Sequence, residues 1–177
     1  HMRKIVVTQF MSLDGVIENP GWSMPYWGDD ISAFKGEESN AAEMLLLGRV
    51  TYDGFAQAWP QSQDEGAPKM NSMPKYVISN TLKEATWNNT TIIHTLDDVA
   101  KLKQGSGGTI LVYGSGKLVN SLIAHNLVDD YRLLVYPVVL GSGQRLFEDG
   151  TKTTLKLVES KTFASGVVSL CYQLADK

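Results

Sequence analysis

The chain has 177 residues, a length that suits one compact domain. Charged residues make up 20% of it, and no apolar run reaches the roughly 18 residues that a membrane-spanning helix needs. The 16 Lys and Arg residues are outnumbered by 19 Asp and Glu residues, which gives a formal charge of -3. No segment collects the basic residues, so the composition predicts a soluble globular protein and excludes nucleic acid and the membrane surface as main partners.

The chain has one cysteine, Cys171, which excludes an internal disulfide and a cysteine-rich zinc site. Its alternating, strand-like surroundings favour a buried structural thiol. No histidine has a companion at metal-ligand spacing, and we expect no metal. The N-terminus lacks the apolar stretch and cleavage site of a secretory signal, which predicts a cytoplasmic protein. We interpret His1 as a cloning remnant and residues 1–177 as a single domain.

Eight segments have the apolar pattern of β-strands, and helical patterns separate the first five. The predicted strands are residues 3–10, 44–47, 75–79, 91–93, 109–113, 130–139, 154–161 and 167–174. Apolar and polar residues alternate in the last segment, which is typical of a half-buried antiparallel strand. The pattern therefore predicts an α/β fold with helices on both faces of a mixed, roughly eight-stranded, mainly parallel sheet that ends in antiparallel strands.

Two strand-to-helix junctions have features of an anion site. In the first, Gly48 permits a tight turn and Arg49 adds a positive charge at the start of a helix. In the second, Gly114 and Gly116 allow close backbone approach, and Ser115 can cap the next helix. A diphosphate could bridge the two helix ends, although neither junction matches a standard nucleotide-binding fingerprint and each could be an ordinary turn.

Two other segments are weaker candidates. Ser79, Asn80 and Thr81 end the third strand, and could bind the ribose or 2′-phosphate of a dinucleotide or simply form a turn. Residues 12–34 are dense in aromatic side chains and lead into a helix that begins near Ile31. Such side chains could stack on a planar heterocycle, or they could plug the sheet edge or a subunit interface.

Five motifs in order carry a family resemblance: TQFMSLDGVI, LLGRVTY, VISNTL, LVYGSGKLVNSL and YPVVLGSGQRLF. Together they resemble the dihydrofolate reductase superfamily, and more closely its branch similar to the reductase domain of riboflavin-biosynthesis deaminase-reductases. The likeness spans nearly the whole chain. It implies a dihydrofolate reductase-like, three-layer α/β/α fold.

The resemblance implies that NADPH lies across the carboxyl edge of the sheet. The cofactor-binding residues would be Gly48, Arg49, Thr51, Ser79, Asn80, Thr81, Gly114, Ser115, Gly116 and Leu118. Members of the family often place a basic residue beside the 2′-phosphate, whereas Asn80 stands there in this sequence, with Lys83 the nearest cation along the chain.

The resemblance also implies a substrate side. Asp30 matches the buried carboxylate of true dihydrofolate reductases and would be catalytic, helping to deliver a proton next to the atom that receives hydride. Asp29 and Asp30 could equally be a routine start of a helix. The substrate-binding candidates are Asp14, Trp22, Trp27, Phe34 and Tyr113.

The resulting hypothesis is an NADPH-dependent reductase that transfers hydride to a planar pterin- or pyrimidine-like acceptor, similar to 5-amino-6-(5-phosphoribosylamino)uracil reductase. Dihydrofolate reductase activity and non-catalytic dinucleotide binding are the alternatives. The family likeness implies a homodimer, with the apolar segments 130–139 and 167–174 as a contact surface unless both strands are internal to the sheet.

Overall fold

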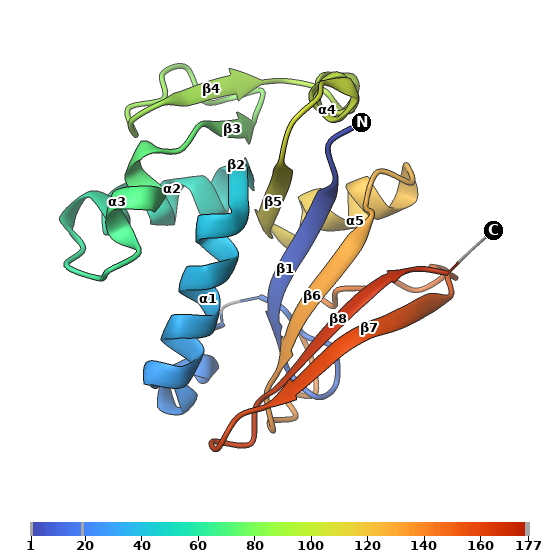
Figure 1. Cartoon of the computed structure of the whole chain (residues 1–177). Coiled ribbons are helices and arrows are strands. Elements are labelled where there is room, and N and C mark those ends of the chain that lie inside the picture. Colours follow the sequence, from blue (N-terminus) through green and yellow to red (C-terminus); the bar gives the residue numbers. More distant parts are fainter. Residues whose placement is uncertain (1, 19, 176–177) are drawn as a thin grey trace.

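The computed structural model describes residues 2–18 and 20–175, so the interpretation of His1 as a cloning remnant lies outside the described residues. Eight strands form one sheet in the order β4-β3-β2-β5-β1-β6-β8-β7 (Figure 1). The strands are β1 (Ile5–Met11), β2 (Ala42–Gly48), β3 (Lys75–Ile78), β4 (Thr90–Ile93), β5 (Thr109–Gly114), β6 (Asp130–Val135), β7 (Leu155–Thr162) and β8 (Val168–Leu174). The first six are parallel, whereas β8 is antiparallel to β6 and β7 to β8. The predicted mixed, mainly parallel sheet with antiparallel final strands is confirmed.

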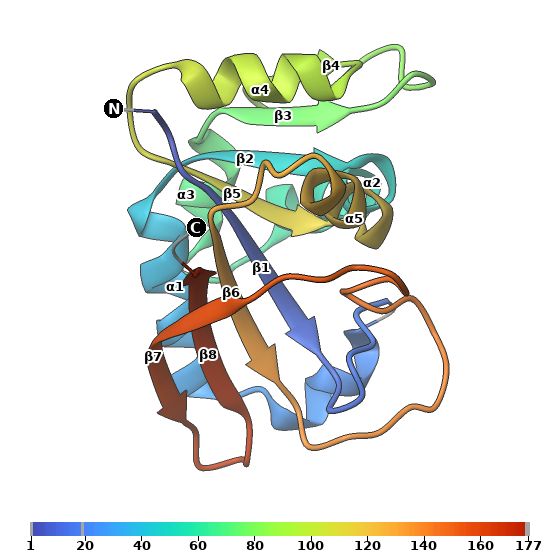
Figure 2. The ribbon, with the colours of Figure 1, turned by 90° about the vertical axis from the view of Figure 1, so that its right-hand side faces the viewer.

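Helices cover both faces of the sheet (Figures 1 and 2). The α-helices are α1 (Asp29–Ala41), α2 (Arg49–Ala58), α3 (Ala67–Ser72), α4 (Leu96–Gln104) and α5 (Gly116–Ala124), and two 3-10 helices are η1 (Pro20–Tyr26) and η2 (Trp59–Gln61). Alternation along β1 shows the layers, because Ile5 and Val7 join a core with α4 and α5. Val6 points the other way, into a core with α2 and α3. This is the predicted α/β/α arrangement.

The antiparallel end of the sheet corrects two expectations. Strands β6 and β8 are each paired on both sides, so the alternative that they are internal is confirmed and their use as an edge contact is wrong. The free edge on this side is β7. The thiol of Cys171 is half-buried rather than buried, and its partial burial raises its pKa.

Among the helices that the structure describes, none is long and apolar enough to cross a membrane.

Candidate active site

The two predicted junctions lie against each other, because β2 and β5 are neighbours in the sheet. Gly48 ends β2 just before α2, and Gly114 ends β5 just before Ser115, the N-cap of α5. A Cβ atom built on Gly48 would lie 2.5 Å from Ser115 Oγ and 2.7 Å from its backbone nitrogen. Only glycine allows this approach, and it brings the N-termini of two helices to one place.

The first turns of the two helices differ in how their N–H groups are used. Ser115 Oγ accepts a hydrogen bond from the Leu118 N–H at 3.4 Å, and the Leu118 side chain is buried in the core. Gly48 offers α2 no side-chain cap, so the first N–H groups of α2 have no capping side chain among the described residues and can donate to a ligand. Thr51, in the first turn of α2, has its Oγ1 3.4 Å from a Cβ built on Gly114. Both helix ends can therefore contribute to one anion site.

The third junction adjoins the start of α2. Arg49 Nη1 donates to Thr81 Oγ1 at 3.0 Å, while Arg49 Nε donates to Asp53 at 3.1 Å. Ser79 Oγ accepts the N–H groups of Thr81 and Leu82, which is ordinary turn chemistry. The cation that contacts this turn is Arg49, which lies far from it along the chain.

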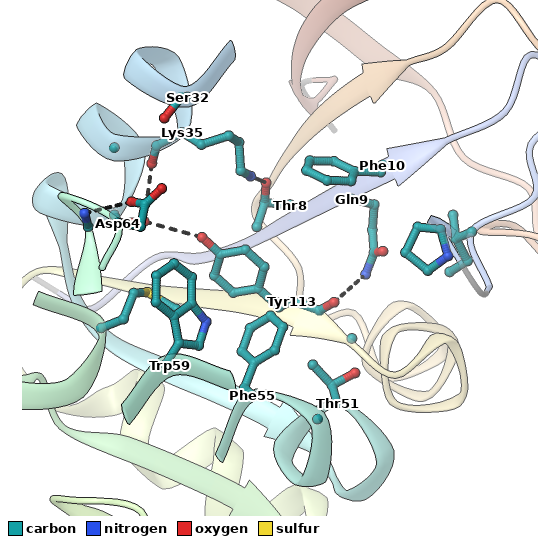
Figure 3. A pocket seen from close by; sticks show the side chains of 18 of the residues that line it. Thr8, Gln9, Phe10, Ser32, Lys35, Thr51, Phe55, Trp59, Asp64 and Tyr113 are labelled. Atoms are coloured by element: carbon teal, nitrogen blue, oxygen red, sulfur yellow. Dashed lines mark hydrogen bonds between the residues drawn. The ribbon is translucent and has the colours of Figure 1, made fainter. Parts of the chain in front are cut away.

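A cavity of about 1270 Å³ opens beside these junctions, between α1 and α2 (Figure 3). Thr51, Gly114, Ser115, Gly116, Trp27 and Tyr113 are the predicted site residues that line it. Aromatic rings form much of its wall, with Tyr113 and Phe55 5.4 Å apart and Phe10 and Trp27 6.2 Å apart, centroid to centroid. The cavity can hold a planar ligand next to the paired helix ends.

A buried ion pair lies at the floor of this cavity. The Lys35 ammonium donates to Thr8 Oγ1 at 2.7 Å and to Glu38 Oε1 at 2.5 Å, and the Thr8 hydroxyl donates to the same carboxylate oxygen at 2.9 Å. Lys35 is 9% exposed and Glu38 6%. Burial by itself lowers the pKa of Lys35, but the adjacent Glu38 carboxylate outweighs it and the pKa is raised. Lys35 Nζ also lies 5.4 Å from the centroid of Phe10 and 5.1 Å from that of Tyr113.

Sequence reasoning did not find this group. Lys35 and Glu38 are three residues apart on a helix, a spacing that usually marks a solvent-exposed pair. The signal in the sequence was Thr8, a polar residue within the otherwise apolar start of the first strand, and the structure places it beneath Lys35.

Residues 3–169 match the family model described as the RibD C-terminal domain. The chain belongs to the RibD C-terminal domain family. This membership supports a reductase-type enzyme.

Three proteins are similar to this chain over nearly its whole length. The uncharacterized protein YyaP of Bacillus subtilis (strain 168) is 34% identical over 178 residues, which cover 96% of this chain and 94% of YyaP. A putative riboflavin biosynthesis protein from Shewanella sp. PV-4 superposes with a TM-score of 0.71 at 19% identity, covering 98% of this chain and 99% of that one. Dihydrofolate reductase from Enterococcus faecalis, complexed with NADP(H) and RAB-propyl, gives 0.68 at 15% identity, with coverage of 98% and 97%. The two structures establish the dihydrofolate reductase-like fold.

The structure places Asp30 differently from the expectation. Asp30 is exposed, lies outside the cavity lining, and its carboxylate accepts the N–H of Ile31. The inward face of α1 carries Ile31, Lys35 and Glu38 instead. The buried carboxylate of this helix is therefore Glu38, because Asp30 falls on the solvent side at the start of the helix.

The other predicted substrate-binding residues either make contacts elsewhere in the fold or line the cavity. Trp22 packs edge-on against Tyr136, with centroids 5.4 Å apart, and Phe34 packs against Phe163 at the same distance. Both lie outside the cavity lining, as does Asp14. Trp22 and Phe34 thus agree with the alternative that the aromatic segment fills space around the sheet edge. Trp27 and Tyr113 remain the cavity-lining pair.

Proposed function

We propose that the chain is an NADPH-dependent reductase that transfers hydride to a planar pterin- or pyrimidine-like heterocycle, similar to 5-amino-6-(5-phosphoribosylamino)uracil reductase. The observation that carries the proposal is the contact between Gly48 and Ser115, which joins two helix N-termini beside the large aromatic cavity. Membership of the RibD C-terminal domain family agrees with it.

The residues at the junctions fit a dinucleotide. The backbone at Gly48 and Gly114 leaves no side chain over the paired helix ends, which suits a diphosphate. Arg49, already oriented by Asp53 and Thr81, would supply positive charge at the adenosine 2′-phosphate region, and Ser79 and Asn80 would flank it. The NADP(H) complex of the E. faecalis neighbour supports the same choice of cofactor. NADPH, when bound, supplies the hydride.

The side chains at the floor and wall of the cavity are suited to binding a planar acceptor. Tyr113, Phe55 and Trp27 offer aromatic faces and edges to a planar ring. Lys35 has three N–H donors and, among the described residues, two oxygen acceptors, so one donor is left for an electronegative atom of the acceptor. In this proposal Glu38 and Thr8 hold the ammonium in place. Asp30 has no part in the chemistry, which removes the residue on which dihydrofolate reductase activity rested.

We also propose that the chain forms a homodimer through the free edge of β7, which replaces the contact surface expected from residues 130–139 and 167–174. Two apolar residues of β7, Leu157 and Val158, are 49% and 55% exposed. An edge strand with exposed apolar side chains is a surface that folded proteins usually cover.

Titration with NADPH, followed by quenching of tryptophan fluorescence, tests the cofactor site, since Trp27 and Trp59 line the cavity. Thr51→Asp adds a negative charge where the diphosphate is expected and should weaken NADPH binding at least about tenfold, or ~1.4 kcal/mol. The fold should persist, because a carboxylate is favoured in the first turn of a helix. Thr51→Ser keeps the hydroxyl and is the matched control. Equal affinity of the folded Thr51→Asp variant would refute the placement.

Measurements of turnover distinguish a reductase from a protein that binds NADPH without catalysing its oxidation. The decrease of NADPH absorbance is followed with a panel of dihydropterins and aminopyrimidines. Oxidation of NADPH that depends on the acceptor supports the reductase, whereas tight NADPH binding with no oxidation by any acceptor would support the binder.

A further inference from the structure

Acidic residues are unevenly distributed around the cavity. Four exposed carboxylates line the cavity from elements other than α2 and α5, which carry the paired helix ends: Asp29 and Glu37 from α1, and Asp64 and Glu65 from the loop before α3. Figure 3 shows Asp64 beside α1, with Tyr113 and Phe55 between it and Thr51 at the start of α2. With the cofactor assigned to the helix ends, the part of the cavity left for the acceptor adjoins α1 and the loop before α3, which carry these four groups.

Positive charge does not balance these carboxylates. Two lysines, Lys35 and Lys117, are the only cations among the described residues that line the cavity. Lys117 belongs to the first turn of α5 and so lies on the cofactor side, together with the fifth lining carboxylate, Glu18, which accepts the Gln144 N–H. Lys35 is neutralised by Glu38 at 2.5 Å. Arg132 lies near Lys35 but outside the cavity lining, so the lining residues of the acceptor side carry a net negative charge.

This distribution of charge favours anionic groups at one end of the cavity and disfavours them at the other. Helix N-termini and a lysine attract an anion at one end of the cavity, while four carboxylates repel an anion at the other. The carboxylates are exposed, so salt weakens each interaction, but a ligand within the cavity lies inside the Debye length of about 8 Å at physiological ionic strength. An acceptor with a phosphate or carboxylate tail would bring that group against this wall.

We infer that the acceptor is an uncharged or cationic planar heterocycle, without phosphate or carboxylate, and that Asp29, Glu37, Asp64 and Glu65 determine this specificity. The inference rests on the proposed function, since it assigns the helix ends to the cofactor. It narrows the acceptor class of the proposed reductase to the heterocyclic ring without the phosphate of a phosphoribosylamino group or the carboxylates of a glutamyl group, because either substituent would lie at the acidic wall.

Two pairs of compounds test the inference: a ribosylaminouracil with and without its terminal phosphate, and dihydrofolate against dihydrobiopterin, which lacks the glutamyl carboxylates. Dissociation constants are measured by tryptophan quenching of the protein saturated with NADPH and, separately, of the free protein. The uncharged member of each pair should bind at least about tenfold more tightly at low salt. The difference should shrink as salt is added. Equal or tighter binding of the anionic members, or no binding of any compound, would overturn the inference.

Reversing the charge of two lining carboxylates tests whether these groups cause the preference for uncharged ligands. Glu37→Lys/Glu65→Lys changes two exposed carboxylates that have no hydrogen bond within the described residues, and should reduce the preference for the uncharged member at least about tenfold. The matched control is Glu148→Lys/Asp149→Lys, which makes the same change of net charge at exposed positions outside the cavity and should leave the preference unaltered. If both variants shift the preference equally, the wall is not its source.

The two proposals fail in different ways. Charge-dependent binding without NADPH oxidation would contradict the reductase and leave the acidic wall supported. Oxidation of NADPH by the anionic members in preference to their uncharged partners would contradict the acidic wall and leave the reductase supported.

Discussion

The group formed by Lys35, Glu38 and Thr8 shows how much a single buried charge depends on its partners. Moving an ammonium and a carboxylate out of water costs several kcal/mol each, and only short, well-directed hydrogen bonds offset that cost. Lys35 and Glu38 share such contacts with Thr8 and with each other. The pair therefore keeps a positive charge at the cavity floor that this site could not hold alone.

Glu38→Gln should lower the free energy of unfolding by about 3–5 kcal/mol, because it leaves the Lys35 ammonium buried without its counter-charge. The double variant Lys35→Met/Glu38→Leu removes both charges and should recover most of that loss. Urea denaturation followed by circular dichroism measures both effects. A Glu38→Gln variant as stable as the unsubstituted chain would show that the pair contributes nothing to the fold.

At the scale of elements, Asp14 joins the loop after β1 to the segment after β6. Its carboxylate accepts hydrogen bonds from the Ser12 hydroxyl and from the N–H groups of Leu140 at 3.2 Å and Gly141 at 2.8 Å. These bonds, the Ser12 hydroxyl first, lower the pKa of Asp14 from 3.8 to about 2. Asp14 was expected to bind substrate, and its contacts make it a clamp between two loops near the cavity.

The clamp has a defined pH dependence. A carboxyl whose pKa is lower in the folded chain stabilises it above the unfolded value of 3.8, and this contribution is lost as pH falls towards the folded value of about 2. Asp14→Asn should lower the Tm by a few degrees at neutral pH, and the gap to the unsubstituted chain should close through this acid range. Differential scanning calorimetry across pH measures the gap, with exposed Asp149→Asn as the control. A gap that stays constant down to about pH 2 would exclude the clamp.

The elements also show what local patterns can predict. The run Leu45 to Leu47 is apolar at every position, which is typical of a parallel strand covered on both faces, and all three residues are fully buried in β2. Because parallel neighbours end at the same edge, the meeting of Gly48 with Ser115 agrees with the expectation that one diphosphate bridges the two junctions, but the pairing of β2 with β5 comes from the structure. The roles of these residues in binding remain predictions.

At the scale of the whole molecule, the order of the strands in the sheet was harder to predict from the sequence. The alternation in β8 predicted an antiparallel strand but not which strand lies at the edge, because pairing order depends on contacts between distant segments. The sequence does carry a signal for the edge strand. Strand β7 contains the charged residues Lys156, Glu159 and Lys161, and charges of this kind are common on unpaired edge strands. The positions of Arg49 beside Thr81 and of Lys35 above Thr8 likewise arise only when helices pack on the sheet.

The dimer proposal is testable at this scale. Strand β7 has one paired side, and a shift in its register with β8 between Leu157 and Glu159 marks an irregularity at the apolar positions. Pairing of two β7 edges around a twofold axis would cover Leu157 and Val158 in both copies, while the flanking lysines would limit other partners. A stable interface needs about 800 Å² from each copy, so side chains beyond Leu157 and Val158 must also take part.

Size-exclusion chromatography with light scattering should show a dimer for the unsubstituted chain and a monomer for Leu157→Lys/Val158→Lys, because two lysines from each copy would meet at the axis. Leu13→Lys is the matched control, since Leu13 is 65% exposed in the loop after β1, and it should remain dimeric. The substitutions lie far from the paired helix ends in sequence and sheet order, so NADPH affinity measured in the same samples should be retained. A monomeric unsubstituted chain, or a β7 variant that stays dimeric, would contradict the assembly while leaving the cofactor site untouched.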